Sequence, residues 1–148
     1  MLVLTIDKIR INLAQSSHEP AVFEASYRQA AVAMILAPGH NDLDVCFIQR
    51  AERDGDPWSG QVAFPGGRAD PSDATANAVA ERETMEEIGL PLHSRQLLGP
   101  LPVRDIQREH LKILSPFVYY VGADSQRIAT VYEKNEVASV FWVPLHHL

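Results

Sequence analysis

The chain has a single cysteine and no long apolar run, and each of these shortages excludes a class of protein. Cys46 has no second cysteine with which to form a disulfide, which suits a reducing compartment. No apolar stretch approaches the roughly 20 residues of a membrane-spanning helix, and residues 1–8 lack the basic and apolar regions of a signal peptide. We therefore expect a soluble cytoplasmic protein without a disulfide framework.

Basic residues are also scarce relative to acidic ones. The 148 residues include 13 lysines and arginines against 19 aspartates and glutamates, which gives a formal net charge of -6. Proteins that bind bulk nucleic acid are usually basic, so this role is disfavoured. An acidic chain that acts on anionic phosphates needs a metal ion to bridge the like charges.

In other respects the composition is that of an ordinary globular domain. Hydrophobic residues make up 46% of the chain and charged residues 22%, so disorder is not expected. The length suits a single domain over residues 1–148 with a core of its own. Because the neighbours of Cys46 are apolar, we expect a small buried core residue there rather than a catalytic thiol.

The distribution of apolar and turn residues predicts short strands with helices between them, hence an α/β sandwich rather than a helical bundle. The first two strands are expected to form a hairpin. The predicted helices cover residues 5–15 and a segment from Ser72 or Asp73 to Ile88 that Gly89 terminates, the predicted strands cover residues 30–37, 44–49, 61–64, 96–103, 114–121 and 138–143, and charged loops are predicted over residues 50–60 and 105–112.

The segment with the most chemical information covers residues 66–90, GGRADPSDATANAVAERETMEEIGL. Its two glycines end a strand and permit a close approach of the backbone. Near the end of the following helix, Glu83, Glu86 and Glu87 stand three and four residues apart, so they share one helix face. Arg82 lies beside them.

This concentration of negative charge destabilises a helix. Carboxylates at a helix C-terminus oppose the macrodipole by roughly 0.3–1 kcal/mol each, and like charges on one face repel one another. A magnesium ion would relieve both effects, because Mg²⁺ prefers oxygen ligands and bridges carboxylates to phosphates. On charge pattern alone, a solvated acidic face with Arg82 as a surface ion-pair partner explains the segment equally well.

Residues 82–90, RETMEEIGL, resemble the second half of the Nudix box, G-x5-E-x7-R-E-U-x-E-E-x-G-U, where U is a bulky aliphatic residue. Two features depart from the box. Thr84 stands where the family prefers an aliphatic residue, and the spacing from Gly67 to Arg82 is one residue longer. The first glutamate of the box is therefore either missing or replaced by Asp73.

The preceding segment, FIQRAERDGDPWSGQVAFPGG, resembles the coenzyme A pyrophosphatase subgroup of Nudix proteins. Its motif is roughly L-L-T-x-R-S/A-x3-R-x3-G-x3-F-P-G-G, and the matching positions here are Arg50-Ala51, Gly60 and residues 64–67. The segment between them is one residue longer than in the motif. The second arginine of the motif therefore falls on Gly55 or Asp56, and Arg53 is a nearby substitute.

The resemblance implies a fold, a cofactor and a reaction. The implied fold is the Nudix α/β/α sandwich, a mixed β-sheet flanked by helices. The implied cofactor is Mg²⁺ or Mn²⁺, held by the three glutamates and by the backbone carbonyl of Gly67, while Arg82 orients a glutamate. The implied reaction is hydrolysis of a diphosphate bond in a small nucleotide-like metabolite, with coenzyme A or a derivative ahead of ADP-ribose and nucleotide sugars.

Several roles stay open at the level of the sequence. The general base is Glu83, Glu86 or Glu109, and Trp58 either stacks on a base or packs under its own loop. Arg50, Arg68 and Arg104 are each either a phosphate contact or a solvated surface arginine.

Three further hypotheses accompany the hydrolase. One is a Nudix-like domain that binds a nucleotide or a partner without catalysis, and another is an unrelated structural domain with an acidic helix. The third is a homodimer, to which the apolar N-terminal helix would contribute.

Overall fold

The computed structural model describes residues 5–15, 23–26, 28–108 and 111–148. In this part of the chain eight strands form one mixed sheet, whose central order is β3-β2-β1-β7-β5, while β4 pairs with β1, β6 with β7 and β8 with β2. The strands are β1 (Gln29–Pro38), β2 (Leu43–Arg50), β3 (Val62–Ala63), β4 (Gly66–Arg68), β5 (Leu97–Pro100), β6 (Arg104–Arg108), β7 (Leu111–Tyr120) and β8 (Val137–Pro144).

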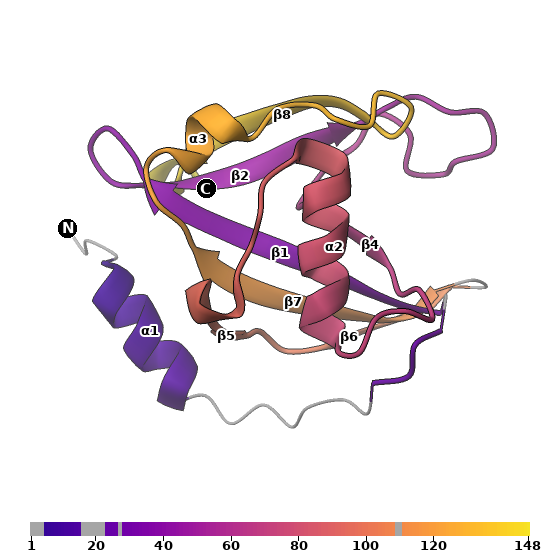
Figure 1. Ribbon diagram of the computed structural model, residues 1–148, viewed down its shortest axis with the longest axis horizontal. Helices are drawn as coiled ribbons and strands as arrows, with labels where there is room; N and C mark the ends of the chain where they lie inside the picture. The colour runs from indigo at the N-terminus through magenta and orange to yellow at the C-terminus, as the bar shows by residue number, and fades with distance from the viewer. Residues whose placement is uncertain (1–4, 16–22, 27, 109–110) are drawn as a thin grey trace.

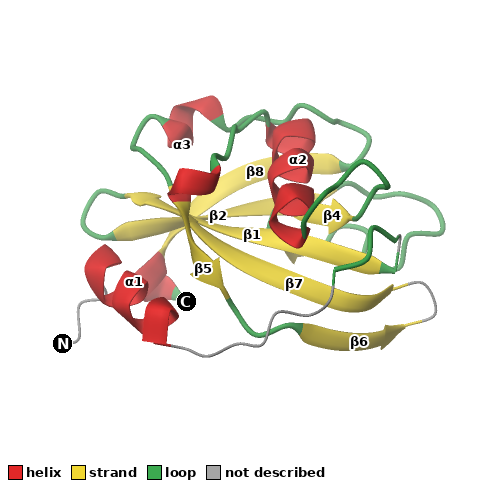
Figure 2. Cartoon of the chain, turned by 60° about the horizontal axis from the view of Figure 1, so that its bottom comes forward, coloured by secondary structure: helices red, strands yellow, loops and turns green. Residues whose placement is uncertain are grey.

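The centre of the sheet is the predicted run of small apolar residues. Strand β1 pairs parallel with β7, in a register that runs from Gln29 with Ile113 to Leu36 with Tyr120. It pairs antiparallel with β2, which confirms the predicted hairpin. Helix α1 (Ile6–Gln15) and helix α2 (Ala76–Ile88) lie on opposite faces of the sheet (Figures 1 and 2). The predicted sandwich of a mixed sheet flanked by helices is therefore confirmed.

Helix α2 covers one face of the sheet and carries the glutamates of interest. Its side chains Val79, Ala80 and Ile88 are buried against alternate residues of β1, because successive side chains of a strand point to opposite faces. The helix ends as predicted, since Gly89 adopts φ 68° and donates its backbone N–H to the Met85 carbonyl at 3.0 Å.

The predicted start of α2 was wrong. Thr75, not Ser72 or Asp73, caps the helix, because the Thr75 hydroxyl accepts the backbone N–H of Ala78 at 3.2 Å. Asp73 lies before the cap, and its carboxylate accepts hydrogen bonds from the side chain of Arg82.

Helix α1 covers part of the opposite face. Its first turn is capped by Thr5, whose hydroxyl accepts the Lys8 backbone N–H at 3.2 Å, as the sequence predicted. Three apolar residues at helical spacing, Ile6, Ile9 and Leu13, pack on the second core cluster of the sheet. The apolar side of α1 is thus used within the chain itself.

Two predicted boundaries around the edge strands were wrong. The segment predicted as a charged loop over 105–112 contains β6, whose Arg104 pairs with Leu114 and Asp105 with Ile113 of β7. Charged side chains are common on edge strands, so the charge pattern concealed a strand. Of the strand predicted over 96–103, only Leu97–Pro100 pairs as β5. The residue before it, Gln96, ends a 3-10 turn (Ser94–Gln96).

The sequence suggested that the glycine turn after β3 ends strand pairing, and this was wrong. The chain resumes pairing as β4, in which Gly66 faces Val32 and Gly67 faces Ala31. Gly66 adopts φ 156°, and a Cβ there would collide with the Ala31 carbonyl oxygen, so only glycine lets β4 approach β1 this closely.

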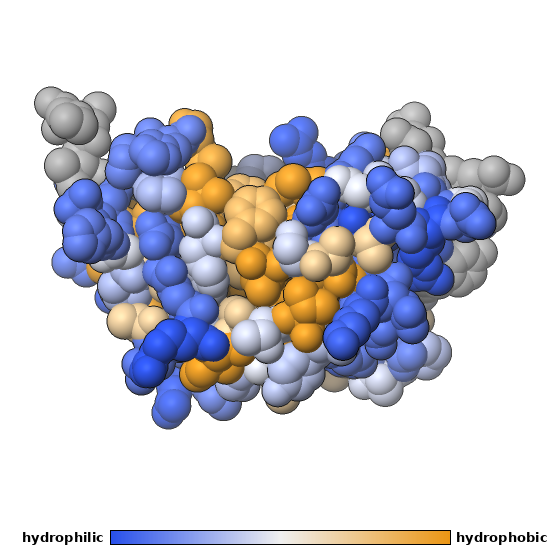
Figure 3. All heavy atoms as spheres, turned by 90° about the horizontal axis from the view of Figure 1, so that it is seen from above, coloured by the Kyte–Doolittle hydropathy of each residue, from blue (hydrophilic) through white to orange (hydrophobic). Residues whose placement is uncertain are grey.

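The remaining elements complete the surface. The short helix α3 (Ser125–Ile128), which the sequence did not predict, lies near β8 (Figure 1). Seen from the side of β8 and α3, the surface carries apolar side chains between two hydrophilic flanks (Figure 3). Cys46 on β2 is fully buried, and burial raises the pKa of its thiol to about 12, which confirms a core residue. Among the helices described, none has the length and apolar character to cross a membrane.

Candidate functional site

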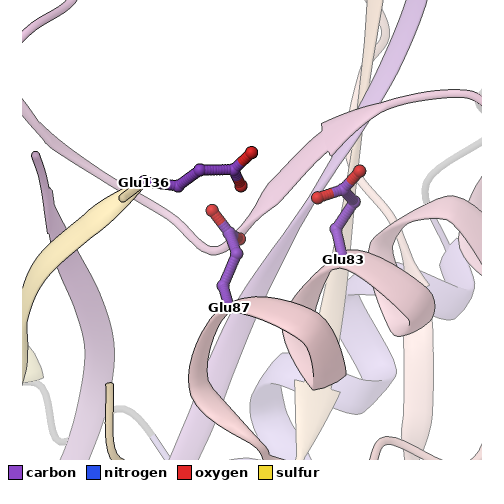
Figure 4. A group of neighbouring side chains, drawn as sticks. All are labelled: Glu83, Glu87 and Glu136. Atoms are coloured by element: carbon purple, nitrogen blue, oxygen red, sulfur yellow. The ribbon is translucent and has the colours of Figure 1, made fainter. Parts of the chain in front are cut away.

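Three carboxylates from two elements converge at one end of α2. Glu83 and Glu87 stand one turn apart on the helix, and Glu136 directly precedes β8 (Figure 4). One carboxylate oxygen of each lies within 4.8 Å of the other two. We call Glu83, Glu87 and Glu136 the carboxylate triad. Its geometry offers three oxygen ligands to a single point.

Glu87 is the most deeply placed member of the triad, with only 2% of its surface exposed. Its Oε1 accepts the backbone N–H of Gly66 at 2.8 Å. Burial raises its pKa to about 8, and the negative charges of Glu83 and Glu136 act in the same direction, although Gly66 and Arg50 oppose them. A cation placed among the three carboxylates of the triad would stabilise the charged form of Glu87.

The glycine turn lies directly against the triad. A Cβ at Gly67 would stand 2.5 Å from the carboxyl carbon of Glu83, so a larger residue would displace that carboxylate. Burial also raises the pKa of Glu83, despite the nearby positive charge of Arg82. The backbone of β4 and the side chains of α2 therefore form one continuous polar surface.

Arg82 organises a second group of carboxylates beside the triad. Its Nε and Nη2 each donate to Asp73 at 3.0 Å, and Nη2 also donates to the backbone carbonyl of Arg68 at 2.9 Å. Its Nη1 donates to Glu83 at 3.0 Å and to Glu86 at 3.1 Å. Hydrogen bonds to Asp73 are the largest cause of the raised pKa of Arg82. The arginine fixes the orientation of Glu83 by a charge-assisted hydrogen bond.

Asp73, which the sequence left undecided, is the buried partner of this arginine. Only 8% of its surface is exposed. Burial by itself would raise the pKa of Asp73, but the hydrogen bonds from Arg82 and from the Asp70 backbone N–H hold it below its usual value. Asp73 therefore supports Arg82 and takes no part in the carboxylate triad.

Glu86 lies apart from the triad. Its side chain is 57% exposed and contacts Arg82. The structure thus brings together two of the three glutamates that the sequence placed in one group, and adds Glu136 to them. Glu109, the remaining candidate for a base, lies outside the described residues.

The triad forms one wall of a pocket of about 840 Å³. Arg50, Arg68, Gly67 and Trp58 also line it, whereas Arg104 and Glu86 are not among the described residues that do. The Arg68 side chain is exposed. The Nη2 of Arg50 donates to Asp56 at 2.9 Å, and its positive charge lies close enough to Glu87 to lower the pKa of that carboxyl.

Sequence patterns could not identify two of these residues. Glu136 is remote from the box, and only the pairing of β8 with β2, in which Val137 faces Arg50, brings it to the site. Asp56 falls on one of the two positions for the second arginine of the motif, but its pairing with Arg50 cannot be deduced from that spacing. Both are placed by tertiary structure rather than by local spacing.

The fold and the site together define an α/β protein with a glycine turn and a carboxylate triad in the wall of a pocket. The chain belongs to the NUDIX domain family, whose pattern it matches over residues 27–148. It is 37% identical over 111 residues to an uncharacterized protein of Schizosaccharomyces pombe, covering 70% of this chain and 32% of that protein. It is 38% identical over 92 residues to the uncharacterized Nudix hydrolase NudL of Citrobacter koseri, covering 59% and 43%. The chain thus spans less than half the length of these relatives.

Solved structures share the fold at low sequence identity. A mutT/nudix family protein from Listeria innocua superposes with a TM-score of 0.62 at 20% identity, covering 84% of this chain and 82% of that one. The NUDIX domain of Shewanella oneidensis NrtR, solved in complex with ADP ribose, superposes with a TM-score of 0.57 at 19% identity, covering 97% and 86%. At these identities the likeness shows the fold alone.

Proposed function

We propose that the chain hydrolyses the diphosphate bond of a nucleoside-diphosphate-linked metabolite and uses Mg²⁺ or Mn²⁺ to do so. The observation that carries the proposal is the carboxylate triad, in which two elements far apart in sequence place three oxygen ligands within 4.8 Å of one another in a pocket wall. Membership of the NUDIX family supports the same reaction class.

The residues at the triad fit a hard divalent cation. Carboxylate oxygens are the ligands that Mg²⁺ prefers. Burial raises the pKa of Glu87 to about 8, so the described residues do not fully stabilise the charged form of this carboxylate. The backbone of Gly67 lies against Glu83, and the resemblance implies the Gly67 carbonyl as a further ligand. When bound, the ion would neutralise diphosphate charge and lower the pKa of a water molecule.

The side chains of the pocket divide the remaining tasks. Glu83, Glu87 and Glu136 would hold the ion, and Arg82 would keep Glu83 in place through its hydrogen bond of 3.0 Å. Glu86, predicted as a further ligand, would have to leave Arg82 in order to join them. Of the two predicted bases that the structure describes, Glu83 lines the pocket and Glu86 does not.

The positive side chains of the pocket provide contacts for the diphosphate. Arg50 and Arg68 line it together with the triad, and guanidinium groups bind phosphate oxygens through paired N–H donors. Trp58 belongs to the same pocket and offers an aromatic surface to a base. In the reaction, water adds to one phosphorus of the P–O–P link, the bond from that phosphorus to the bridging oxygen breaks, and the two halves leave as phosphate monoesters.

Coenzyme A or a derivative is our first choice of substrate, with ADP-ribose and nucleotide sugars as the alternative. The first choice rests on the likeness of residues 50–67 to the coenzyme A pyrophosphatase motif. The alternative rests on the missing second arginine of the motif, whose position falls on Gly55 or on the carboxylate Asp56, since neither residue attracts an additional phosphate group as an arginine does.

A matched pair of substrates tests both parts of the proposal. Coenzyme A and dephospho-coenzyme A share the diphosphate link and differ by a single phosphate group, so they should be incubated with the protein and Mg²⁺ beside ADP-ribose and UDP-glucose. Mass spectrometry should detect the two phosphate monoester products of at least one substrate, and none after chelation of the metal. Absence of product from all four, with Mn²⁺ bound at the triad, would favour the non-catalytic binding domain.

A homodimer stays a prediction. Helix α1, which was expected to contribute to it, packs its apolar side chains on its own sheet. Light scattering that finds only a monomer would exclude the dimer.

A further inference from the structure

The loop between β2 and β3 is ordered by its own hydrogen bonds. The Ser59 hydroxyl accepts the Arg53 backbone N–H and donates to the Arg53 carbonyl, both at 2.8 Å. The ends of the loop are held by two backbone bonds of 2.9 Å, from Arg50 to Gln61 and from Ala51 to Glu136. The loop is therefore a preformed wall of the pocket, and it is bonded directly to a member of the triad.

Asp56 connects this loop to Arg50. One carboxylate oxygen accepts the Trp58 backbone N–H at 3.0 Å, and the other accepts from Nη2 of Arg50 at 2.9 Å. The side chains of Asp56 and Arg50 are only 14% and 31% exposed. The bond from Trp58 is the largest cause of the lowered pKa of Asp56, followed by the bond from Arg50. The carboxylate therefore has two fixed partners in the pocket wall.

The pairing leaves a buried donor of Arg50 without a partner. Its Nε is buried and finds no hydrogen-bond partner among the described residues. A buried N–H without an acceptor destabilises a protein by about 1–3 kcal/mol, so such a donor is normally satisfied by a ligand or by water. Arg50 lines the same pocket as Glu87 and lowers the pKa of that carboxyl, so its guanidinium lies in the neighbourhood where a diphosphate would be held.

We propose that Asp56 is a positioning residue, which holds the Arg50 guanidinium by Nη2 so that its remaining N–H donors face a diphosphate oxygen beside the triad. This inference rests on the proposed function and names how that site recognises its anion. The carboxylate lowers the net positive charge of the pocket, but it also removes the freedom of a long side chain before binding. A fixed donor loses less conformational entropy when the anion arrives.

The alternative role of Asp56 is purely electrostatic, and it makes the opposite prediction. If Asp56 only repelled anions, its replacement by asparagine would strengthen binding whether or not Arg50 is present. If it positions Arg50, the same replacement weakens binding, and it does so only when Arg50 is present. A double-mutant cycle between the two residues distinguishes these cases.

The experiment measures the affinity of the full chain for adenosine 5′-(α,β-methylene)diphosphate with Mg²⁺ by calorimetry. The four proteins are the wild type, Asp56→Asn, Arg50→Ala and the double variant. Asparagine keeps an oxygen that can accept the Trp58 N–H, so the loop should stay folded, and equal unfolding temperatures would verify this. The expected result is an affinity about tenfold lower for D56N than for the wild type, with no loss when D56N is added to R50A.

Asp124→Asn is the matched control. It removes a carboxylate from another arginine pair, Asp124 with Arg127 at 2.8 Å, whose side chains are 80% and 82% exposed. Its affinity for the probe should equal that of the wild type. Tighter binding of D56N in both backgrounds, additive losses, or a wild type that does not bind the probe would overturn the inference. Because the probe is not hydrolysed, intact coupling without turnover of any substrate would retire the proposed hydrolase and keep the role of Asp56.

Discussion

The carboxylates on and around α2 fall into two neighbouring groups, which differ in whether they contact Arg82. Asp73 and Glu86 are bound to this arginine, at 3.0 and 3.1 Å, whereas Glu87 and Glu136 make no bond to it among the described residues. Glu83 belongs to both groups. The pKa of Asp73 is lowered, while that of the even more buried Glu87 is raised to about 8. Similar burial of the same chemical group thus leads to opposite protonation behaviour.

The difference shows what one cation does for a buried acid. Asp73 is stable as a carboxylate because the guanidinium of Arg82 replaces the water that it lost. Glu87 receives one backbone N–H from Gly66 and the more distant charge of Arg50, which do not offset its burial and two acidic neighbours. We infer that the group around Arg82 is the support and that the triad is the part that binds a metal ion. The four predictions below test this division.

The largest effect is expected for Glu87→Gln. The neutral amide removes the most buried charge of the triad, so both the affinity for Mn²⁺ and kcat/KM should fall by more than about 100-fold, beyond the range for residues that only support a ligand. Calorimetric titration and turnover of the best substrate would measure the two quantities. Turnover within about threefold of the wild type would break the distinction between the two groups.

The next effect concerns the stability of the metal-free protein. The folded-state pKa of Glu87, about 8, lies above the value of 4.5 expected for the unfolded chain, so the folded state binds the proton more tightly. Its contribution is fully present below pH 4.5 and is lost as the pH rises through 8. Each pKa unit corresponds to about 1.4 kcal/mol, so the loss amounts to a few kcal/mol.

Urea unfolding at pH 5 and pH 8, with and without Mg²⁺, would measure this dependence. Saturating Mg²⁺ should restore much of the stability at pH 8, since it binds the charged form of the folded protein only. In E87Q, the loss between the two pH values should become smaller. A metal-free wild type that is as stable at pH 8 as at pH 5 would contradict the assignment of a strained acid to Glu87.

A smaller effect is expected for Asp73→Asn, which leaves the triad itself unchanged. The neutral side chain loosens Arg82 and through it Glu83, so the affinity for Mn²⁺ should fall by about tenfold, in the range for residues that support metal ligands. Asp70→Asn is the control, because Asp70 is exposed and its carboxylate accepts hydrogen bonds from Ser72 alone among the described residues. An equal loss in both variants would show that Asp73 has no specific role.

The smallest effect is expected for Glu86→Gln. Its carboxylate is 57% exposed and its ion pair with Arg82 is partly screened by water, so the affinity for a first Mn²⁺ ion should change by less than about threefold. Parallel titrations of E86Q and E87Q provide the comparison. Equal losses in the two variants would favour the prediction from the sequence that all three glutamates of the box hold the metal.

The sequence predicted the elements whose signals are local. Small apolar residues over 30–37 predicted the central strand, and the polar cap of α1 and the glycine after Ile88 marked helix ends correctly. Edge strand β6 was missed because its charges, which protect an edge from other strands, are the same signal that marks a loop.

The site was predicted in part for the same reason. Glu83 and Glu87 share a helix face by spacing alone, so their proximity was accessible from the sequence. Glu136 enters only through the pairing of β8 with β2, and Asp56 only through the fold of its loop. The role of Asp73 could not be decided from spacing. With the extra residue in the box, the first glutamate is either missing or replaced by Asp73, and the structure adds that the Asp73 carboxylate binds Arg82.

The most direct test of the central claim is the position of a bound metal ion. Crystals of the full chain grown with Mn²⁺ would give an anomalous scattering peak at each manganese ion. The division of carboxylates described above predicts the strongest peak within coordinating distance of Glu83, Glu87 and Glu136, with Asp73 still bound to Arg82. A strongest peak at Glu86, or none near the triad at saturating Mn²⁺, would contradict it.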